Sequence, residues 1–173
     1  MDDRKERFRR ITDAKRRGDV QYLVEALTDP DHRFTALRSL GDLGASEAVP
    51  AIMRLLNVQK PTVRAEAATV LGRLEAKEAV PALIEMAEAD PVPATRSYAV
   101  AALGRIGDTR ARPILTSLLN DSEVWIRRGA ASALGRVGDA TSTEPLKAAA
   151  RREPLWRRRR YRRAMRAARA RRD

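Results

Sequence analysis

The sequence predicts an all-α fold: an α-solenoid of about five stacked two-helix repeats, preceded by an extra N-terminal helix. The first observation behind this prediction is an internal repeat, marked by the regular spacing of Pro50, Pro81, Pro113 and Pro145. The second is composition, because aromatic residues make up only 4% of the chain and leave Ala, Leu, Val and Ile to build the core. Such a core is thin for one globular unit but normal for helices that stack in an array.

The N-terminal segment, residues 1–18, predicts a helix that covers the first repeat. The stretch "DDRKERFRRITDAKRR" precedes Gly18, and its apolar residues Phe8, Ile11 and Ala14 recur at helical spacing. We expect these three side chains to face the first repeat.

Each repeat then begins with a helix that carries proline in its opening turn, where the missing N–H costs no hydrogen bond. The copies are "AVPAIMRLL" (48–56), "AVPALIEMA" (79–87) and "ARPILTSLL" (111–119). In the first copy, Val49, Ile52, Leu55 and Leu56 form one apolar stripe. Short linkers such as "EADPVPA" and "NDSE" stop one helix and start the next.

A second helix completes each repeat. Its copies are "HRFTALRSLGDLG" (32–44), "VRAEAATVLGRLE" (63–75), "TRSYAVAALGRIG" (95–107) and "IRRGAASALGRVG" (126–138). Every copy has an arginine near its start and a glycine two turns later, and the intervening small residues let neighbouring helices approach closely. Gly44, Gly107 and Gly138 are predicted to end their helices in the left-handed conformation, whereas Glu75 breaks this pattern.

The C-terminal segment aligns with the preceding repeat when it is shifted by one repeat length, "PLWRRRRYRRAMRA" (154–167) on "EVWIRRGAASALGR" (123–136). It therefore predicts a degenerate fifth repeat in which only residues 169–173 stay free. The predicted apolar stripe of its second helix consists of Trp156 (or Leu155), Tyr161, Ala164, Met165 and Ala168.

The repeated block, with its "AVP", "LL", "VR" and "LGR" elements in fixed order, resembles the HEAT-like repeat family, in particular the bacterial repeats of the phycobilin-lyase type. The resemblance covers residues 19–141 as four units and implies a right-handed solenoid with one convex and one concave helix layer. The chain is accordingly divided into a capping helix (1–18), four repeats (19–141) and a basic degenerate repeat (142–173).

Charge is concentrated at the C-terminal end. The net charge is +12, and residues 151–173 alone contain twelve arginines against two acidic residues. Such asymmetry favours an anionic partner: nucleic acid, an anionic membrane surface or an acidic protein. The chain has no cysteine, no apolar run that could cross a bilayer and no signal-peptide core, which predicts a cytoplasmic protein, monomeric or part of a hetero-complex.

Recurrent arginines precede the glycines described above, at Arg33, Arg64, Arg96 and Arg127. They suggest either a row that binds phosphate or a structural ladder between repeats. The resemblance implies the ladder, with Asp90 and Asp121 in the linkers as expected partners.

Two enzyme families have related folds, and the residues that each needs can be compared with this sequence. Deoxyhypusine hydroxylases hold two irons with His–Glu pairs, whereas this chain has one histidine, His32, followed by Arg33. We therefore expect no metal site and no cofactor, and we expect His32 to be a capping or surface residue. Alkylpurine DNA glycosylases use a carboxylate and tryptophans on a basic concave face, which Glu66, Tyr98, Trp125 and Arg128 imitate only loosely; this is the third-ranked function.

The leading hypothesis is a non-catalytic scaffold that binds a protein partner through its concave face. Repeat register places arginines and aromatics there, and arginine and aromatic side chains are frequent anchors in interfaces. The predicted concave-face residues are Phe34, Arg38, Arg73, Tyr98, Arg105, Trp125, Arg128 and Arg136. A solvated helix surface, with Trp125 covering the next repeat, is the alternative interpretation.

The second hypothesis is binding of an RNA or DNA backbone through the arginine-rich C-terminal helix, because arginine and aromatic residues suit phosphate contact and base stacking. The predicted anion-binding residues are Arg157, Arg159, Arg160, Arg162, Arg163, Arg166 and Arg169. An anionic membrane surface is a weaker alternative for the same helix, since its apolar stripe is narrow and rich in alanine.

Overall fold

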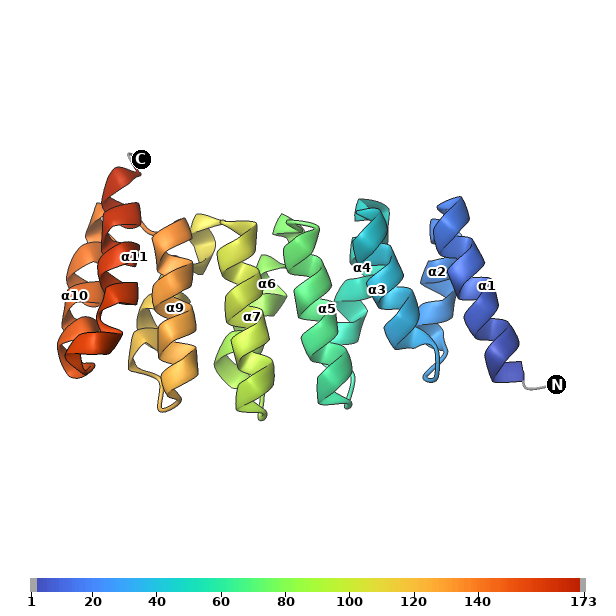
Figure 1. The fold of residues 1–173 in the computed structure, drawn as a ribbon, viewed down its shortest axis with the longest axis horizontal. Helices are drawn as coiled ribbons and strands as arrows, with labels where there is room; N and C mark the ends of the chain where they lie inside the picture. The colour runs from blue at the N-terminus through green and yellow to red at the C-terminus, as the bar shows by residue number, and fades with distance from the viewer. Residues whose placement is uncertain (1–2, 172–173) are drawn as a thin grey trace.

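The computed structural model describes residues 3–171, and within that range every regular element is a helix (Figure 1). Short 3-10 turns begin or end most of the α-helices. In chain order the α-helices are α1 (Asp3–Arg17), α2 (Val20–Glu25), α3 (Arg33–Leu43), α4 (Val49–Arg54), α5 (Pro61–Arg73), α6 (Val80–Ala89), α7 (Pro93–Ile106), α8 (Arg112–Ser117), α9 (Val124–Val137), α10 (Thr143–Arg152) and α11 (Arg159–Ala170).

The helices form two layers, which confirms the predicted solenoid. The second helices of the five repeats, α3, α5, α7, α9 and α11, lie side by side in one layer, and α2, α4, α6, α8 and α10 lie behind them (Figure 1). Helix α1 packs on α2 and α3 and extends the front layer. Consecutive second helices from α5 to α11 pack closely on one another, whereas consecutive first helices contact each other far less. The second helices are therefore closer to one another than the first helices are, so the second-helix side is the inner face of the array.

Glycine and alanine set the spacing of this inner layer. A Cβ placed on Gly72 would lie 2.9 Å from Ala102 Cα, and one on Gly104 would lie 2.7 Å from Ala133 Cβ. The same contact recurs between α9 and α11, where a Cβ on Gly135 would lie 3.0 Å from the Cα of its alanine partner. These separations leave no room for a side chain, so the repeated glycine lets each second helix touch the backbone of the next.

The ends of the second helices follow the predicted caps with one exception. Gly44 and Gly107 adopt the left-handed conformation, with φ of 68° and 76°. Glu75 keeps the same geometry without glycine, with φ of 52°. The prediction for Gly138 was wrong, because this residue is extended, with φ of −75° and ψ of 164°. Here a side chain is excluded by space, since a Cβ would overlap the carbonyl oxygen of Leu134.

The N-terminal helix buries two of the three residues expected. Ile11 and Ala14 are buried against the first repeat, but 53% of the Phe8 surface is exposed. One turn before Ile11, it is Arg7 that points towards the α2–α3 linker, where its guanidinium donates to Asp29. Phe8 is therefore turned away from the packed side of the helix.

The C-terminal segment forms a fifth repeat, but its aromatic start differs from the prediction. Tyr161, Ala164 and Ala168 are buried and Met165 is half-buried, as expected. Trp156 and Leu155 are 73% and 74% exposed, because Leu155–Arg157 form a separate 3-10 turn before α11 begins. The helix continues to Ala170 rather than ending at Ala168, and the last two residues (172–173), like the first two, lie outside the described range.

The recurrent arginines form the structural ladder. Arg64 donates from Nε and Nη2 to the Asp90 carboxylate, at 2.7 and 2.9 Å, and from Nη1 to the carbonyls of Val58 and Gln59. This ladder arginine thus closes its own linker and reaches the linker of the following repeat. Arg96 reaches the following linker as well, since its Nη2 pairs with Asp121 at 3.1 Å, but in the described part of the chain it makes no hydrogen bond to the carbonyls of its own linker.

Three further arginines follow this pattern with other partners. Arg127 donates to the linker carbonyls of Asp121 and Ser122 and pairs with Glu153 at 3.4 Å. Arg33 donates to the carbonyls of Leu27 and Thr28. Arg158, which repeat register aligns with Arg127, donates to the carbonyls of Glu153 and Arg151. Arg64, Arg96 and Arg127 therefore link consecutive repeats, whereas Arg33 and Arg158 bond only carbonyls next to their own helices.

The Arg64–Asp90 pair is the most enclosed rung, with side chains only 10% and 4% exposed. Burial alone would raise the pKa of Asp90, but hydrogen bonds from Arg64 and from the Val92 N–H outweigh it and lower the pKa. The carboxylate is therefore held charged inside the array, where losing its partner would be costly.

Gly104→Ala is expected to lower the free energy of unfolding by about 1–3 kcal/mol, because the new methyl group overlaps Ala133. Gly129→Ala is the matched control in the next second helix, where a Cβ meets only a Val100 methyl group at 3.3 Å. The overlap at Gly129 is milder, and the better helix propensity of alanine stabilises the folded state by as much as about 1 kcal/mol. Denaturant unfolding compares the two variants; equal stabilities would contradict the close-approach role of Gly104.

Arg64→Met is expected to cost about 3–5 kcal/mol, because it leaves the buried Asp90 carboxylate without its partner. Arg73→Met, which removes an exposed pair with Asp42, should cost less than about 1 kcal/mol. Thermal and denaturant unfolding of both variants give the comparison. The ladder would lose its structural role if the two substitutions destabilised the protein to the same small extent.

Candidate binding groove on the second-helix face

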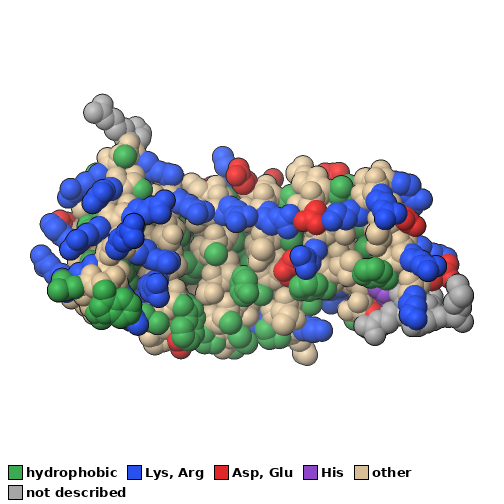
Figure 2. Space-filling view, in the orientation of Figure 1, with side chains coloured by type: hydrophobic (Ala, Val, Ile, Leu, Met, Phe, Trp, Pro, Cys, Tyr) green, Lys and Arg blue, Asp and Glu red, His purple; other side chains and the backbone are tan. Residues whose placement is uncertain are grey.

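A line of charged side chains crosses the second-helix layer from α11 towards α1 (Figure 2). We call its central part, Arg73, Arg105 and Arg136 in the last turns of α5, α7 and α9, the arginine row. The three residues occupy the same repeat position, so the stacking of the helices sets them in register. The row continues towards the N-terminus with Asp42 and Lys15, which bond each other at 2.6 Å.

The charge of this face is balanced only in its N-terminal half. Arg73 donates to Asp42 at 2.5 Å, and Arg38 lies 3.9 Å from Glu66. Among the described residues, no carboxylate lies within 4.0 Å of the guanidinium groups of Arg105, Arg128 or Arg136. The predicted positive face is therefore neutralised at Arg38 and Arg73 and is positive from α7 onward.

Aromatic side chains lie in the first half of the same helices. Phe34, Tyr98 and Trp125, on α3, α7 and α9, are 40%, 48% and 51% exposed and are here called the aromatic edge. Figure 2 shows hydrophobic side chains gathered along this side of the face, below the line of basic residues. About half of the Trp125 surface faces solvent.

Part of each predicted set lines one continuous groove, whereas Phe34, Arg38, Arg73 and Trp125 line neither of its two hollows. A hollow of about 410 Å³ over α5, α7 and α9 has Tyr98 and Arg105 in its wall. It continues into a cleft of about 630 Å³ between α9 and α11, which we call the end cleft. Arg136, Ser132 and Arg160 line both. Residues predicted separately on the concave face and on the C-terminal helix therefore share one surface.

The arginines of α11 are divided between two faces of the helix. Arg159, Arg160 and Arg163 line the end cleft together with Arg157, Arg128 and Arg136. Arg162, Arg166 and Arg169 are exposed but do not line the cleft. Repeat register places Arg166 where the earlier second helices have the close-approach glycine, so this other face corresponds to the side on which α9 receives α11.

Trp156 stands at the mouth of the end cleft. Its ring is 73% exposed, and the Arg157 guanidinium carbon lies 4.4 Å from the ring centroid. Glu153 is buried nearby, 3.4 Å from Arg127 and 3.9 Å from Arg157. The alignment of repeats had put Trp156 on the buried stripe; Pro154, which sets off the short 3-10 turn, is the signal that argued for exposure.

The model of the family described as HEAT repeats matches residues 20–97 and 80–166. The chain belongs to the HEAT-repeat family. Together the two matches cover most of the chain, from the first helix of the first repeat into α11. No curated protein sequence matches the chain.

Solved structures show the same HEAT-repeat architecture. Human deoxyhypusine hydroxylase is 29% identical over 68% of this chain, with a TM-score of 0.61, and the complex of CpcE and CpcF of phycocyanin lyase from Nostoc is 28% identical over 82%, with a TM-score of 0.62. The chain spans 43% and 61% of the lengths of these two proteins. An engineered protein, 20% identical over 91% of the chain with a TM-score of 0.65, shares the fold.

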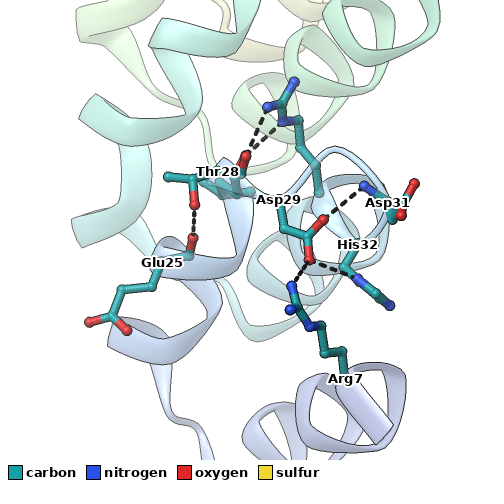
Figure 3. A network of polar contacts seen from close by, with 8 residues as sticks. Arg7, Glu25, Thr28, Asp29, Asp31 and His32 are labelled. Atoms are coloured by element: carbon teal, nitrogen blue, oxygen red, sulfur yellow. Dashed lines mark hydrogen bonds and ion pairs between the residues drawn. The ribbon is translucent and has the colours of Figure 1, made fainter. Parts of the chain in front are cut away.

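Within residues 3–171, no three His, Cys, Asp or Glu side chains gather where they could hold an ion. The single histidine, His32, is buried, and its Nδ1 lies 3.0 Å from Asp29 Oδ2 (Figure 3). The expectation that His32 is a capping or surface residue was wrong: it stands at the N-cap position of α3, but its side chain is buried and makes no capping hydrogen bond.

Asp29 collects the polar contacts at this end of the HEAT array (Figure 3). It accepts hydrogen bonds from the Asp31 N–H and from Arg7, each at 3.0 Å, in addition to the His32 contact. The bond to His32, followed by those from Asp31 and Arg7, lowers the pKa of Asp29 to about 2. The network joins α1 to the first linker and is a structural contact.

The residues considered for a glycosylase do not converge. Tyr98 lines the central hollow and Arg128 the end cleft, but neither hollow has Glu66 or Trp125 in its wall. Glu66 instead lies beside Arg38. No helix of the described range is long and apolar enough to span a bilayer.

The stability of the HEAT array is expected to fall between about pH 4 and pH 2, and Asp42 to contribute to that fall. Hydrogen bonds from Lys15 and then from Arg73 lower the pKa of Asp42 to about 2, whereas an unfolded aspartate titrates near pH 3.9. Because the folded-state pKa is depressed, its stabilisation is present above the unfolded pKa and disappears as the pH falls through the folded one.

Asp42→Asn should therefore be less stable than the parent at pH 7 and approach it at pH 2, measured by thermal unfolding across this range. If the stability of the two proteins changed with pH in the same way, the hydrogen bonds from Lys15 and Arg73 to Asp42 would contribute nothing to folding stability.

Proposed function

We propose that this chain is a non-catalytic HEAT-repeat scaffold that holds a partner protein on its second-helix face, as one member of a hetero-complex. The observation that carries the proposal is the pairing of the aromatic edge with the arginine row on one open surface. Exposed aromatic and arginine side chains are the anchors that most often dominate protein interfaces. A partner segment lying across the repeats would bury its apolar side chains on the edge and direct acidic ones to Arg105 and Arg136.

The chemistry of the groove supports binding without a reaction. Its walls consist of arginines, small residues, Tyr98 and Trp156. A guanidinium stays protonated and offers donors only, so it binds anions but is not a general base. One structural neighbour, the complex of CpcE with CpcF, pairs two proteins, which supports a protein partner for this chain.

Nucleic-acid binding is a second candidate, favoured by one specific observation. Six arginines line the end cleft, and only Arg157 among them has a carboxylate within 4.0 Å in the described part of the chain. This cleft lies between α9 and α11, apart from the aromatic edge.

Replacing both Tyr98 and Trp125 by alanine is expected to reduce capture of the partner protein at least tenfold, because loss of two interface aromatics typically costs about 2 kcal/mol or more. Cross-linking with the tagged full chain in cells, followed by nuclease treatment and quantitative mass spectrometry, measures this capture. Phe8→Ala is the control, since Phe8 is equally exposed but lies on α1. Equal capture by the parent and the double variant, or capture that vanishes with nuclease, contradicts the proposal.

A further inference from the structure

We propose that the end cleft binds the backbone of a single-stranded nucleic acid, with Trp156 as a stacking platform for a base. This function goes beyond the scaffold role, because it uses a different part of the molecule and a partner of different chemistry. The end cleft lies at the α9–α11 end of the groove, and the aromatic edge lies over the first halves of α3, α7 and α9.

The positive charge of the end cleft favours the binding of a polyanion. Arg128, Arg136, Arg159, Arg160 and Arg163 line one cavity of about 630 Å³, and no described carboxylate lies within 4.0 Å of any of their guanidinium groups. Glu153, which lies 3.9 Å from the cleft residue Arg157, is buried and also pairs with Arg127. Five unpaired cations around one cavity repel each other, and a chain of phosphates relieves that repulsion more fully than single carboxylates do.

Trp156 distinguishes a nucleic acid from an acidic peptide. The Arg157 guanidinium lies over one face of the ring, 4.4 Å from its centroid, and the residue is 73% exposed, so the other face is open to a base. Burying this tryptophan against the repeat would have stabilised the fold. A flat aromatic face beside arginines is what single-stranded nucleic-acid sites use, because every base can stack on it. An acidic peptide would satisfy the arginines and leave the ring unused. A paired duplex keeps its bases stacked on each other, so the platform indicates a single strand.

The two faces of α11 separate a specific role from general solubility. Arg162, Arg166 and Arg169 lie on the face that in α9 packs against the next repeat, where they keep the exposed end of the array polar. Arg159, Arg160 and Arg163 turn instead into the end cleft. The helix thus provides two sets of three arginines with equal charge and helix propensity but different direction.

These two sets define the experiment. Fluorescence anisotropy with labelled oligouridylate and oligodeoxythymidylate compares the full chain with two triple variants, Arg159/Arg160/Arg163→Gln and Arg162/Arg166/Arg169→Gln. Trp156→Ala tests the platform, and Trp125→Ala, its equivalent one repeat earlier, is the aromatic control. None of the six arginines makes a side-chain hydrogen bond or ion pair within the described chain, so both triple variants should fold; circular dichroism confirms this.

The cleft-facing variant should lose about two units of the slope of log K against log salt and bind roughly 50-fold more weakly near 0.15 M salt, as expected for three lost phosphate contacts. The Arg162/Arg166/Arg169→Gln variant should weaken binding by less than about a fifth of that factor, that is, by less than about tenfold. Trp156→Ala should weaken binding about tenfold with an unchanged salt slope, because stacking releases no counterions. Trp125→Ala should bind as the parent does.

Three outcomes would overturn the inference: no binding of either oligonucleotide, equal losses for the two triple variants, or unchanged affinity of Trp156→Ala. Competition by polyglutamate as strong as that by the oligonucleotides would assign the cleft to an acidic protein segment instead. Because the scaffold role is tested after nuclease treatment and at Tyr98 and Trp125, either proposal can fail while the other stands.

Discussion

Contact between the backbones of consecutive second helices is the constraint on which the rest of this structure depends. Gly72, Gly104 and Gly135 each remove the one atom that would keep a helix away from the alanine facing it. The second helices are therefore close together while the first helices spread apart, which makes the second-helix side the inner face. The same contact fixes the register between repeats, so side chains at one repeat position fall into a row. Without that register, Arg73, Arg105 and Arg136 would be scattered charges.

Arginine has three different roles in this chain, and the position within the repeat decides which one applies. At the ladder position its planar group bridges linker carbonyls and an acid of the next repeat, as Arg64 does with Asp90. At the last turn of the second helix it faces the groove. On the outer side of α11 it replaces glycine and small residues that elsewhere receive a neighbouring helix. The many arginines of this chain therefore do not share one function, and those at the ladder position hold the repeats together.

The period and the resemblance predicted the fold well because both reflect contacts that recur in every unit. The five repeats, the proline starts, the ladder partners Asp90 and Asp121 and the caps at Gly44 and Gly107 were all predicted from the sequence. Two errors fall where the periodicity stops. Phe8 lies before the first repeat, and Trp156 follows Pro154 in a 3-10 turn that periodicity cannot anticipate. Gly138 stands at the same repeat position as Gly107 but is extended, although the aspartate after each glycine caps a 3-10 turn in the same way. For the candidate groove, register predicted which residues share the second-helix face. Which of them line the groove, the ion pairs of Arg38 and Arg73, and the continuity with the end cleft depend on side-chain directions across repeats.

The arginine at position 166 has a consequence for how such a molecule can change in length. A repeat duplicated between α5 and α9 would find glycine on one side and alanine on the other, and it would add one more step to the groove. The face of α11 differs, because Arg166 stands at the repeat position where α9 has Gly135, the residue that lets α11 approach closely. Duplication of an internal repeat would therefore lengthen the array and leave the end cleft between α9 and α11 unchanged. Evolution or design can set the reach of the scaffold without rebuilding the site at its end.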